Sequence, residues 1–253
     1  MVKPMTVLLA ALSLPALLPR PACSQQPDQP IYTFVASWAV PRAQWAEFAS
    51  SWDKNFKPVL DRMLADGTIV EWGRSEAVVH NPTGSTHTVW WAAPSLSGTQ
   101  RALAQLIRLE PSPALLAATK HEDVLLRSLV YRVRPGTVTA GYLEISYTQV
   151  QAGKGQEWRA LWEKYSRPVL ENLYENGAIA GYGIDVEHVH TGDPGGRFTW
   201  ILFPNAEALD KAEAAFEAAR QKNPMPSPSP FLEVTVAGAH RDMLERVVHY
   251  VRK

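Results

Sequence analysis

The sequence contains a single cysteine, Cys23, among its 253 residues. One thiol cannot form a disulfide within the chain, and it cannot supply the several cysteines of a zinc or iron–sulfur site. Because Cys23 lies near the N-terminus, the rest of the chain has no cysteine to act as a nucleophile. The folded protein must therefore draw its stability from a packed apolar core.

The sequence also lacks an apolar run of the length that crosses a bilayer, which is about 20 residues. Residues 6–18 form a shorter apolar run that follows the basic Lys3 and precedes small residues ending at Ser24. This order is typical of a signal peptide. We predict that residues 1–24 are removed, that 25–30 form an N-terminal tail, and that the protein is periplasmic or secreted.

Cleavage before Cys23 is the alternative, and it would expose this cysteine for attachment of a lipid. A bacterial lipoprotein signal usually has leucine three places before its cysteine, and Arg20 stands there in this sequence. We therefore favour export without a lipid anchor.

Neither sign of charge is in excess, since 25 lysine and arginine residues face 25 aspartate and glutamate residues. Recognition of phosphate groups normally requires clustered basic residues, so nucleic acid and anionic membranes are not expected partners. The nine tryptophans and eight tyrosines favour a large core or an aromatic-lined cavity. We expect a small apolar or aromatic ligand.

The chain resembles itself when it is shifted by 110 positions, without a gap. This frame superposes pairs of tryptophan, glycine, proline, histidine and lysine residues: Trp52 and Trp162, Lys54 and Lys164, Pro58 and Pro168, Gly67 and Gly177, Gly73 and Gly183, His80 and His190, Trp90 and Trp200. Self-similarity of this length indicates two copies of one structural unit.

The offset becomes 119 near the end of each copy, which implies an insertion of nine residues in the second copy. We place this insertion in the proline-rich stretch 223–230, whose composition is typical of a loop. The sequence predicts a first unit over 31–134, a linker over 135–141 and a second unit over 142–253.

Each copy shows the same order of periodicities. Residues rich in β-branched and aromatic types predict first strands over 31–40 and 142–150. Apolar residues three and four apart predict a helix over 43–66 that ends at Gly67, with a kink or break at Pro58. Strands at 68–80, 86–92 and 128–133, and a second helix at 97–109, complete a βαββαβ unit. The second copy repeats this order, with a helix at 205–221 and a final strand at 246–251.

A βαββαβ unit is ferredoxin-like, with two helices on one face of a four-stranded antiparallel sheet and the other face left apolar. The duplication, the tryptophan-rich first helix and the hairpin between the second and third strands resemble the dimeric α+β barrel superfamily. This superfamily includes antibiotic-biosynthesis-monooxygenase-like, EthD-like and NIPSNAP-like proteins. The resemblance implies an α+β fold in which two tandem ferredoxin-like units pack sheet to sheet as an intramolecular dimeric α+β barrel, so that a monomer can suffice.

The resemblance leaves two kinds of function open, because the superfamily includes cofactor-free oxygenases, haem-binding enzymes and proteins without an assigned activity. We favour an exported small-molecule-binding protein without a cofactor, since the sequence shows no nucleophile, phosphate loop or complete metal set. The alternative is a small-molecule enzyme, such as a cofactor-free or haem-linked oxygenase.

Three residues are candidates for catalysis. His80 and His190 form a matched pair at strand ends, where a neutral imidazole could serve as a general base. Closure of the hairpin through a backbone hydrogen bond is the alternative. Glu144 stands where the first copy has Phe34, and burial in a cavity would raise its pKa. Exposure at an outer edge is the alternative for Glu144.

His188 and His190 alternate along a predicted strand and could therefore place two imidazoles on one face, as a weak candidate metal site. An exposed pair at a hairpin end is the alternative, and we expect no metal.

The remaining candidates are ligand-binding residues that occur in matched pairs. Lys54 and Lys164 could hold an anionic group, or they could extend into water. Trp90 and Trp200 could stack on a ligand or belong to the core. Two runs that lead into the final strands could each form a hydrogen-bonded cluster, which is either structural or part of a site: His121, Asp123 and Arg127 in the first copy, and His240, Asp242 and Arg246 in the second.

Overall fold

The computed structural model describes residues 30–80, 84–192 and 194–253. The predicted signal peptide, Cys23 and most of the predicted tail lie outside these residues. In the first half the strands are β1 (Tyr32–Trp38), β2 (Glu71–Ala77), β3 (His87–Ala93) and β4 (His121–Val133). The second half contains β6 (Gly141–Gln149), β7 (Gly181–Glu187), β8 (Gly196–Phe203) and β9 (Arg241–Arg252), preceded by the short β5 (Gly136–Val138).

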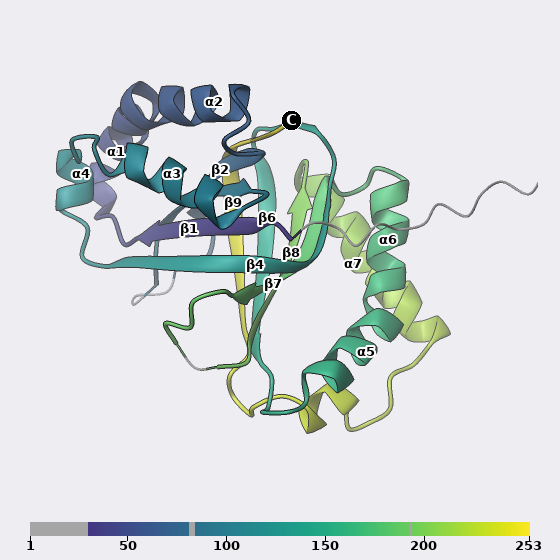
Figure 1. The fold of residues 1–253 in the computed structure, drawn as a ribbon. Helices are drawn as coiled ribbons and strands as arrows, with labels where there is room; N and C mark the ends of the chain where they lie inside the picture. Colours follow the sequence, from purple (N-terminus) through teal and green to yellow (C-terminus); the bar gives the residue numbers. More distant parts are fainter. Residues whose placement is uncertain (1–29, 81–83, 193) are drawn as a thin grey trace, which may run out of the picture.

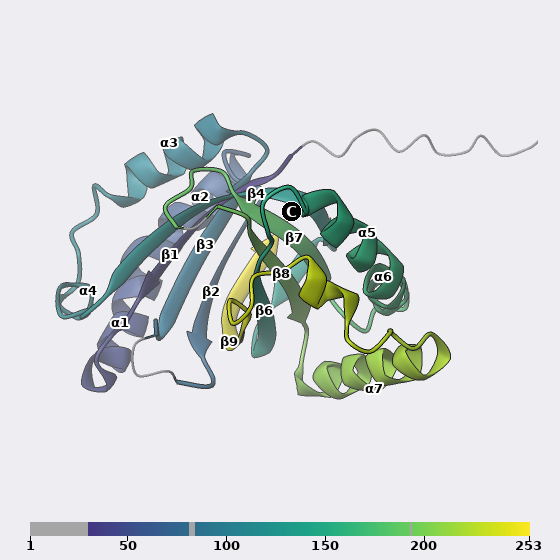
Figure 2. The same cartoon turned by 90° about the horizontal axis from the view of Figure 1, so that it is seen from below.

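The strands form one closed antiparallel barrel of eight strands. Each half contributes a four-stranded sheet, in the order β2-β3-β1-β4 and β7-β8-β6-β9. The edges of the two sheets are joined by hydrogen bonds at two seams, β4 to β7 and β9 to β2. The expected intramolecular α+β barrel is therefore confirmed, and its two sheets face each other across a shared interior (Figures 1 and 2).

The helices cover the outside of the barrel. Those of the first half lie on one side and those of the second half on the opposite side (Figure 2). They comprise a 3-10 turn at Arg42–Gln44, α1 (Trp45–Ser51), α2 (Lys57–Ala65), α3 (Leu96–Leu106) and α4 (Pro113–Leu116), then α5 (Gly155–Tyr165), α6 (Arg167–Glu175), α7 (Ala206–Lys222) and a 3-10 turn at Pro230–Glu233. No helix in the described part of the chain has both the length and the apolar character needed to span a bilayer.

The expected disturbance before each helical proline takes two forms. In the first half a π-helical segment, Trp52–Phe56, joins α1 to α2 just before Pro58. In the second half α5 ends at Tyr165 and α6 begins at Arg167, one residue before Pro168. A proline lacks the N–H that would continue the helical ladder, so the turn before it must be rebuilt.

Glycine and capping residues set the ends of the helices. Gly67 and Gly177 follow the helices with φ angles of +80° and +78°, a conformation that residues with a Cβ rarely adopt. Ser95 and Asn205 precede α3 and α7, and their side chains accept hydrogen bonds from the backbone N–H groups of Gly98 and Ala208. The helix ends predicted at Gly67 and Gly177 are both confirmed.

Some of the expected boundaries need correction. The final strand of the first half begins at His121, seven residues earlier than predicted, because β4 pairs with the whole of β1 as far as Trp38. The insertion in the second half lies mainly in a helix, since α7 has 17 residues where α3 has 11. In addition, part of the predicted linker is β5, which pairs with the end of β9.

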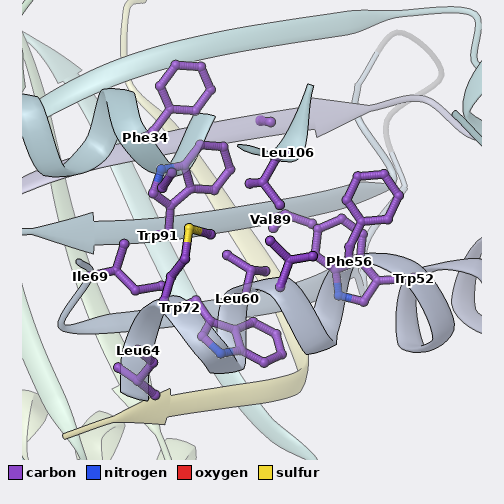
Figure 3. Close-up of a cluster of buried hydrophobic side chains, with 14 of the residues drawn as sticks. Phe34, Trp52, Phe56, Leu60, Leu64, Ile69, Trp72, Val89, Trp91 and Leu106 are labelled. Carbon is purple, nitrogen blue, oxygen red and sulfur yellow. The ribbon is translucent and has the colours of Figure 1, made fainter. Parts of the chain in front are cut away.

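The apolar core has three parts. Two of them lie between the helices and the sheet, one in each half, and Figure 3 shows the first, with Trp72 and Trp91 among its labelled side chains. The third lies inside the barrel and includes Trp90, Leu143 and Val247. Because side chains alternate along a strand, Trp90 points into the barrel while Trp91 points toward the helices.

Candidate functional site

A cavity of about 1470 Å³ runs through the interior of the barrel and extends beyond it. Its inner wall includes apolar and aromatic side chains together with carboxylates: Val35, Trp90, Tyr131, Leu143, Ile145, Trp200, Leu202, Tyr250, Glu71, Asp185 and Glu245. At one end it opens beside the hairpin residues Val79 and His80, and it continues along the outer face of β6 toward Glu213 on α7. A wall of this kind suits a small, mostly apolar molecule.

Two tryptophans lie flat over glycines in this wall. Trp90 is the register partner of Gly73 and Trp200 that of Gly183. A Cβ atom on Gly73 would lie 2.1 Å from Trp90 Cζ2, and one on Gly183 would lie 2.4 Å from Trp200 Cζ2. Only glycine permits so close an approach of the indole to the neighbouring strand.

Each tryptophan also reaches toward a tyrosine of the other half. The ring centroids of Trp90 and Tyr250 are 6.2 Å apart, and those of Trp200 and Tyr131 are 5.8 Å apart. Tyr250 pairs with Gly73 across one seam, and Tyr131 pairs with Gly183 across the other. The two seams thus carry the same Trp-Gly-Tyr row, which forms much of the aromatic wall.

Asp185 is the most unusual acidic residue in the wall. It is 5 % exposed, and its Oδ2 accepts a 2.7 Å hydrogen bond from Trp200 Nε1. Its Oδ1 has no hydrogen bond of acceptable geometry among the described residues, although the unpaired hydroxyl of its register partner Ser128 lies close enough to influence it. Burial raises the pKa of Asp185 to about 6, although the hydroxyl of Ser128 and the indole of Trp200 oppose the shift. Asp185 is thus a carboxylate of increased basicity in the wall of the cavity.

A second buried carboxylate, Glu245, is fully occupied by hydrogen-bond donors. Ser75 Oγ lies 2.5 Å from its Oε2 and Thr88 Oγ1 lies 3.0 Å from its Oε1. Burial raises the pKa of Glu245, and the two hydroxyl groups counteract part of that increase. Glu245 therefore ties β9 to β2 and β3 and leaves neither oxygen free.

Glu71 is the centre of a third polar group. Its Oε2 accepts hydrogen bonds from Tyr250 Oη at 2.6 Å and from Arg252 Nη1 at 3.2 Å. Arg252 Nη1 also lies 2.5 Å from Tyr131 Oη. Burial, followed by the charge of Glu71, raises the pKa of both tyrosines well above the usual value, so both carry their protons near neutral pH. These contacts lock Tyr131 and Tyr250 in place.

The sequence-predicted residues divide between this wall and other places. Trp90 and Trp200 both lie on the wall, as a ligand-binding role requires. Asp185, Glu245 and Glu71 were not among the candidates. The signal for Asp185 was the alternation Gly181, Gly183, Asp185 along one strand, which puts this carboxylate on the same face as the glycine beneath Trp200.

The histidine candidates lie at the ends of hairpins and are exposed. His80 lies at the mouth of the cavity, with its Nε2 3.1 Å from the carbonyl oxygen of Ala77, which is the backbone contact given above as the alternative. β7 ends at Glu187, so strand alternation does not place His188 and His190 on one face. His188 contacts the ring of Tyr32 instead. In the described part of the chain, no group of three or more His, Cys, Asp or Glu side chains is placed to hold a metal ion.

Glu144 does not share the interior with Asp185. It lies on the helix-facing side of β6, where its register partner is Ile201, a member of the second helix–sheet core. Burial, then the charges of Asp242 and Glu213, raises the pKa of Glu144, in the direction expected from the sequence. The carboxylate therefore faces the groove beside α7.

The lysine candidates are exposed and lie on the outer helices. Lys54 belongs to the π-helical segment, and Lys164 lies near the end of α5 with its Nζ 4.8 Å from the ring centroid of Tyr165. Neither borders the cavity.

The expected His/Asp/Arg clusters form only in part. His121 pairs with Asp123 at 3.0 Å and His240 with Asp242 at 3.2 Å, and all four side chains are largely exposed. The arginines take other places: Arg246 pairs with Glu76 across a seam at 2.5 Å, and Arg127 forms no ion pair with Asp123 in the described part of the chain. Side chains two apart on β4 and β9 share a face, but an arginine four residues further along is too distant to close the cluster.

Haem is one cofactor that the resemblance to the superfamily implies, and its usual axial ligand is histidine. All seven histidines belong to the described residues, and His80 at the mouth is the one that borders the cavity. The polar groups that line the interior include carboxylates, tyrosines and hydroxyl groups, and none of them is an imidazole. A histidine-ligated haem therefore does not fit the interior of this barrel.

Comparison with known proteins shows the fold alone. No protein-family model and no curated protein sequence matches this chain. Among solved structures, a candidate monooxygenase from Lactobacillus acidophilus NCFM is 8% identical, with a TM-score of 0.64 over 89% of this chain and 97% of that one. A candidate monooxygenase from Fusobacterium nucleatum is 6% identical, with a TM-score of 0.61 over 88% and 94%. An anthrone oxidase-like protein is 11% identical, with a TM-score of 0.53 over 89% and 94%.

The chain thus has the fold of the dimeric α+β barrel superfamily, with both halves of the barrel in one polypeptide. Its activity has to be argued from its own side chains, because identities this low carry no residue-by-residue correspondence.

Proposed function

We propose that the barrel interior binds a small, mostly aromatic molecule that presents an O–H or N–H group to Asp185. The observation that carries this proposal is Asp185, a residue of the cavity wall whose buried Oδ1 has no partner among the described residues. A buried acceptor without a donor is costly, and a donor on a ligand would remove that cost. The tryptophans beside it supply flat apolar surface for a ring.

The charge inside the barrel supports the same ligand chemistry. Glu71, Asp185 and Glu245 are buried, and Arg252 is paired with Glu71. An anionic ligand would face these carboxylates in a medium of low dielectric constant, whereas a hydrogen-bond donor would be stabilised there. We therefore expect neutral or cationic ligands in preference to anionic ones.

A second candidate function, turnover with molecular oxygen, is favoured by the basicity of Asp185. A carboxylate with a pKa of about 6 is suited to accept a proton near neutral pH. A substrate with an acidic CH2 group beside a ring would lose a proton to Asp185, and the resulting carbanion could pass electrons to O2. The balanced reaction converts the CH2 group and O2 into a carbonyl group and water. The fold likeness to candidate monooxygenases and to an anthrone oxidase-like protein supports this second candidate.

Asp185→Asn tests both functions. The dissociation constants of paired aromatic compounds, with and without a hydroxyl group, are measured through tryptophan fluorescence, and oxygen uptake is followed with the same compounds. We expect the variant to weaken binding of the hydroxylated member about tenfold or more, because a hydrogen bond to a charged group is lost. Binding of the compound without the hydroxyl group should change little.

Glu233→Gln, which removes an exposed carboxylate, is the matched control. Equal affinities of wild type and Asp185→Asn for every hydroxylated compound would rule out the role of Asp185 in binding. If binding depends on Asp185 but none of the compounds causes oxygen uptake, the binding function is supported and the oxygenase function is rejected.

We also propose that the chain is exported after loss of residues 1–24 and works as a monomer. The apolar segment that follows Lys3 supports export, and a barrel closed within one chain supports the monomer. N-terminal sequencing of the protein from the periplasm or medium, and its mass in solution by light scattering, are the corresponding measurements. A protein whose N-terminal residue lies before position 22 would contradict removal of residues 1–24. A stable dimer in solution would contradict the monomer.

A further inference from the structure

A buried arginine lies on the helix-facing side of β2, away from the barrel cavity. Arg74 is 3 % exposed, and its Nε and Nη1 have no hydrogen-bond partner among the described residues. Asp53 and Glu76 are the nearest favourable charges, but neither forms an ion pair with Arg74 in the described part of the chain. An unpaired buried charge costs several kcal/mol in general, so a missing partner is indicated.

Two more nitrogen atoms without partners lie in the same region. They are Nε2 of His87, which is fully buried, and Nε1 of Trp52, which is 3 % exposed. The ring of Phe48 contacts both, with centroid distances of 4.4 Å to His87 and 6.2 Å to Trp52. Thr86 Oγ1 lies 2.9 Å from His87 Nδ1 and 3.2 Å from the carbonyl oxygen of Trp38. When the hydroxyl donates to Nδ1 the ring proton is on Nε2, and when it donates to Trp38 the ring proton is on Nδ1.

The strand register brings these groups together. Arg74 pairs with Val89, and His87 is two residues away from Val89 on the same face of β3. Trp52 and Phe56 lie over this face from the π-helical segment, in the same core as Val89 (Figure 3). The positive charge of Arg74 contributes to lowering the pKa of His87, after the larger effect of burial, so the two side chains interact.

We propose that Arg74, His87 and Trp52 form a buried binding site for one compact anion, of the size of a halide, nitrate or carboxylate group. All the unsatisfied atoms are nitrogens that can present N–H groups, so the missing partner is an acceptor. A negative charge would also neutralise Arg74. This site is on the opposite face of the sheet from Asp185 and does not depend on the proposed function.

The second half shows that the fold does not need this arginine. At the position that matches Arg74 it has Ile184, which is fully buried in an apolar core. The helix above also differs, since the first half has the π-helical segment where the second half has a break at Ser166. Local π-helical geometry is frequent at functional sites. A buried cation that only one half has acquired is expected to serve binding.

The test is thermal unfolding of the purified protein in chloride, nitrate, formate or benzoate, with gluconate keeping the ionic strength constant. A compact anion that binds the folded state should raise Tm saturably above background, by about 3–6 °C for each tenfold increase beyond Kd. Stabilisation by benzoate would indicate that the site takes the carboxylate of a larger aromatic ligand. Stabilisation by the small anions alone would indicate a free compact anion.

Arg74→Ile should abolish this response, and Ile184 indicates that isoleucine packs at this position. Trp52→Phe keeps the ring but removes one N–H group, so it should weaken the response several-fold. Arg62→Gln removes an exposed arginine from α2 and should leave the response unchanged. The proposal is overturned if none of the anions stabilises the wild type saturably, or if Trp52→Phe responds as Arg62→Gln does.

Discussion

Trp200 Nε1 donates a 2.7 Å hydrogen bond to Asp185 Oδ2 inside the barrel. The indole thereby fixes one carboxylate oxygen, while the other, Oδ1, is buried without a partner among the described residues. The same tryptophan lies over Gly183, so the orientation of the acid depends on a glycine two residues before it in the same strand.

The stability of the protein should depend on pH through Asp185. Its pKa of about 6 in the folded state is above the ordinary value of 3.8, so the folded state binds this proton more tightly than the unfolded state does. Stability from this group is therefore present below about pH 4 and falls as pH rises to about 6, by an amount on the order of 3 kcal/mol. Asp185→Asn should lack this fall when urea unfolding is followed from pH 4 to pH 8. A variant whose profile runs parallel to that of the wild type would contradict the assignment, and Glu233→Gln is the control.

Alanine at Gly73 should disturb the aromatic wall. The added methyl group would overlap the ring of Trp90, so we expect a loss of about 1–3 kcal/mol and a changed tryptophan emission spectrum. Gly192→Ala is the matched control, because its Cβ would meet nothing closer than Glu187 Oε1 at 3.7 Å. Equal stabilities of the two variants would show that Trp90 moves aside without cost.

Removal of the Ser75 hydroxyl should weaken the protein more at high pH than at low pH. Glu245 would lose a donor while it remains buried, which would raise its pKa further. We expect Ser75→Ala to cost about 1–3 kcal/mol at pH 8 and less at pH 5. Urea denaturation at both pH values measures this difference, with the exposed Ser97→Ala as control. A cost that is the same at both pH values would indicate that Glu245 is already protonated.

Two arginines that cross the β2–β9 seam should contribute unequally. Arg252 is paired with the buried Glu71, whereas Arg246 is exposed and paired with Glu76. Arg252→Met would leave Glu71 without its charged partner and should cost about 3–5 kcal/mol. Arg246→Met should cost less than about 1 kcal/mol, as is usual for exposed pairs. Chemical denaturation of both variants decides the comparison, and equal losses would exclude a special role for Arg252.

Much of the architecture could be predicted because local rules and the self-similarity agreed. Gly67 and Gly177 end helices through a backbone conformation that only glycine adopts easily, and this requirement is visible in a single sequence. The sequence showed that Gly73 matches Gly183 and that Trp90 matches Trp200, but it gave no reason for keeping these residues in both copies. The strand contacts do, since each glycine makes room for an indole.

The candidate site could not be predicted in the same way. Alternation along β7 places Gly183 and Asp185 on one face and Tyr182 and Ile184 on the other, but it does not say which face becomes the interior. Both faces are buried, one by the helices and one by closure of the barrel, so hydrophobicity does not distinguish them. For the same reason the sequence could not tell whether Glu144 lies inside the barrel; it lines the part of the cavity beside α7 instead.

The sequence by itself determined the order of the main elements and the helix ends at Gly67 and Gly177, because these depend on local propensity and spacing. Only the tertiary structure decided which carboxylates lie inside and which of their oxygens lack a partner. The physical reason is that burial and hydrogen bonding at Asp185 and Arg74 depend on strands and helices that meet only when the barrel closes.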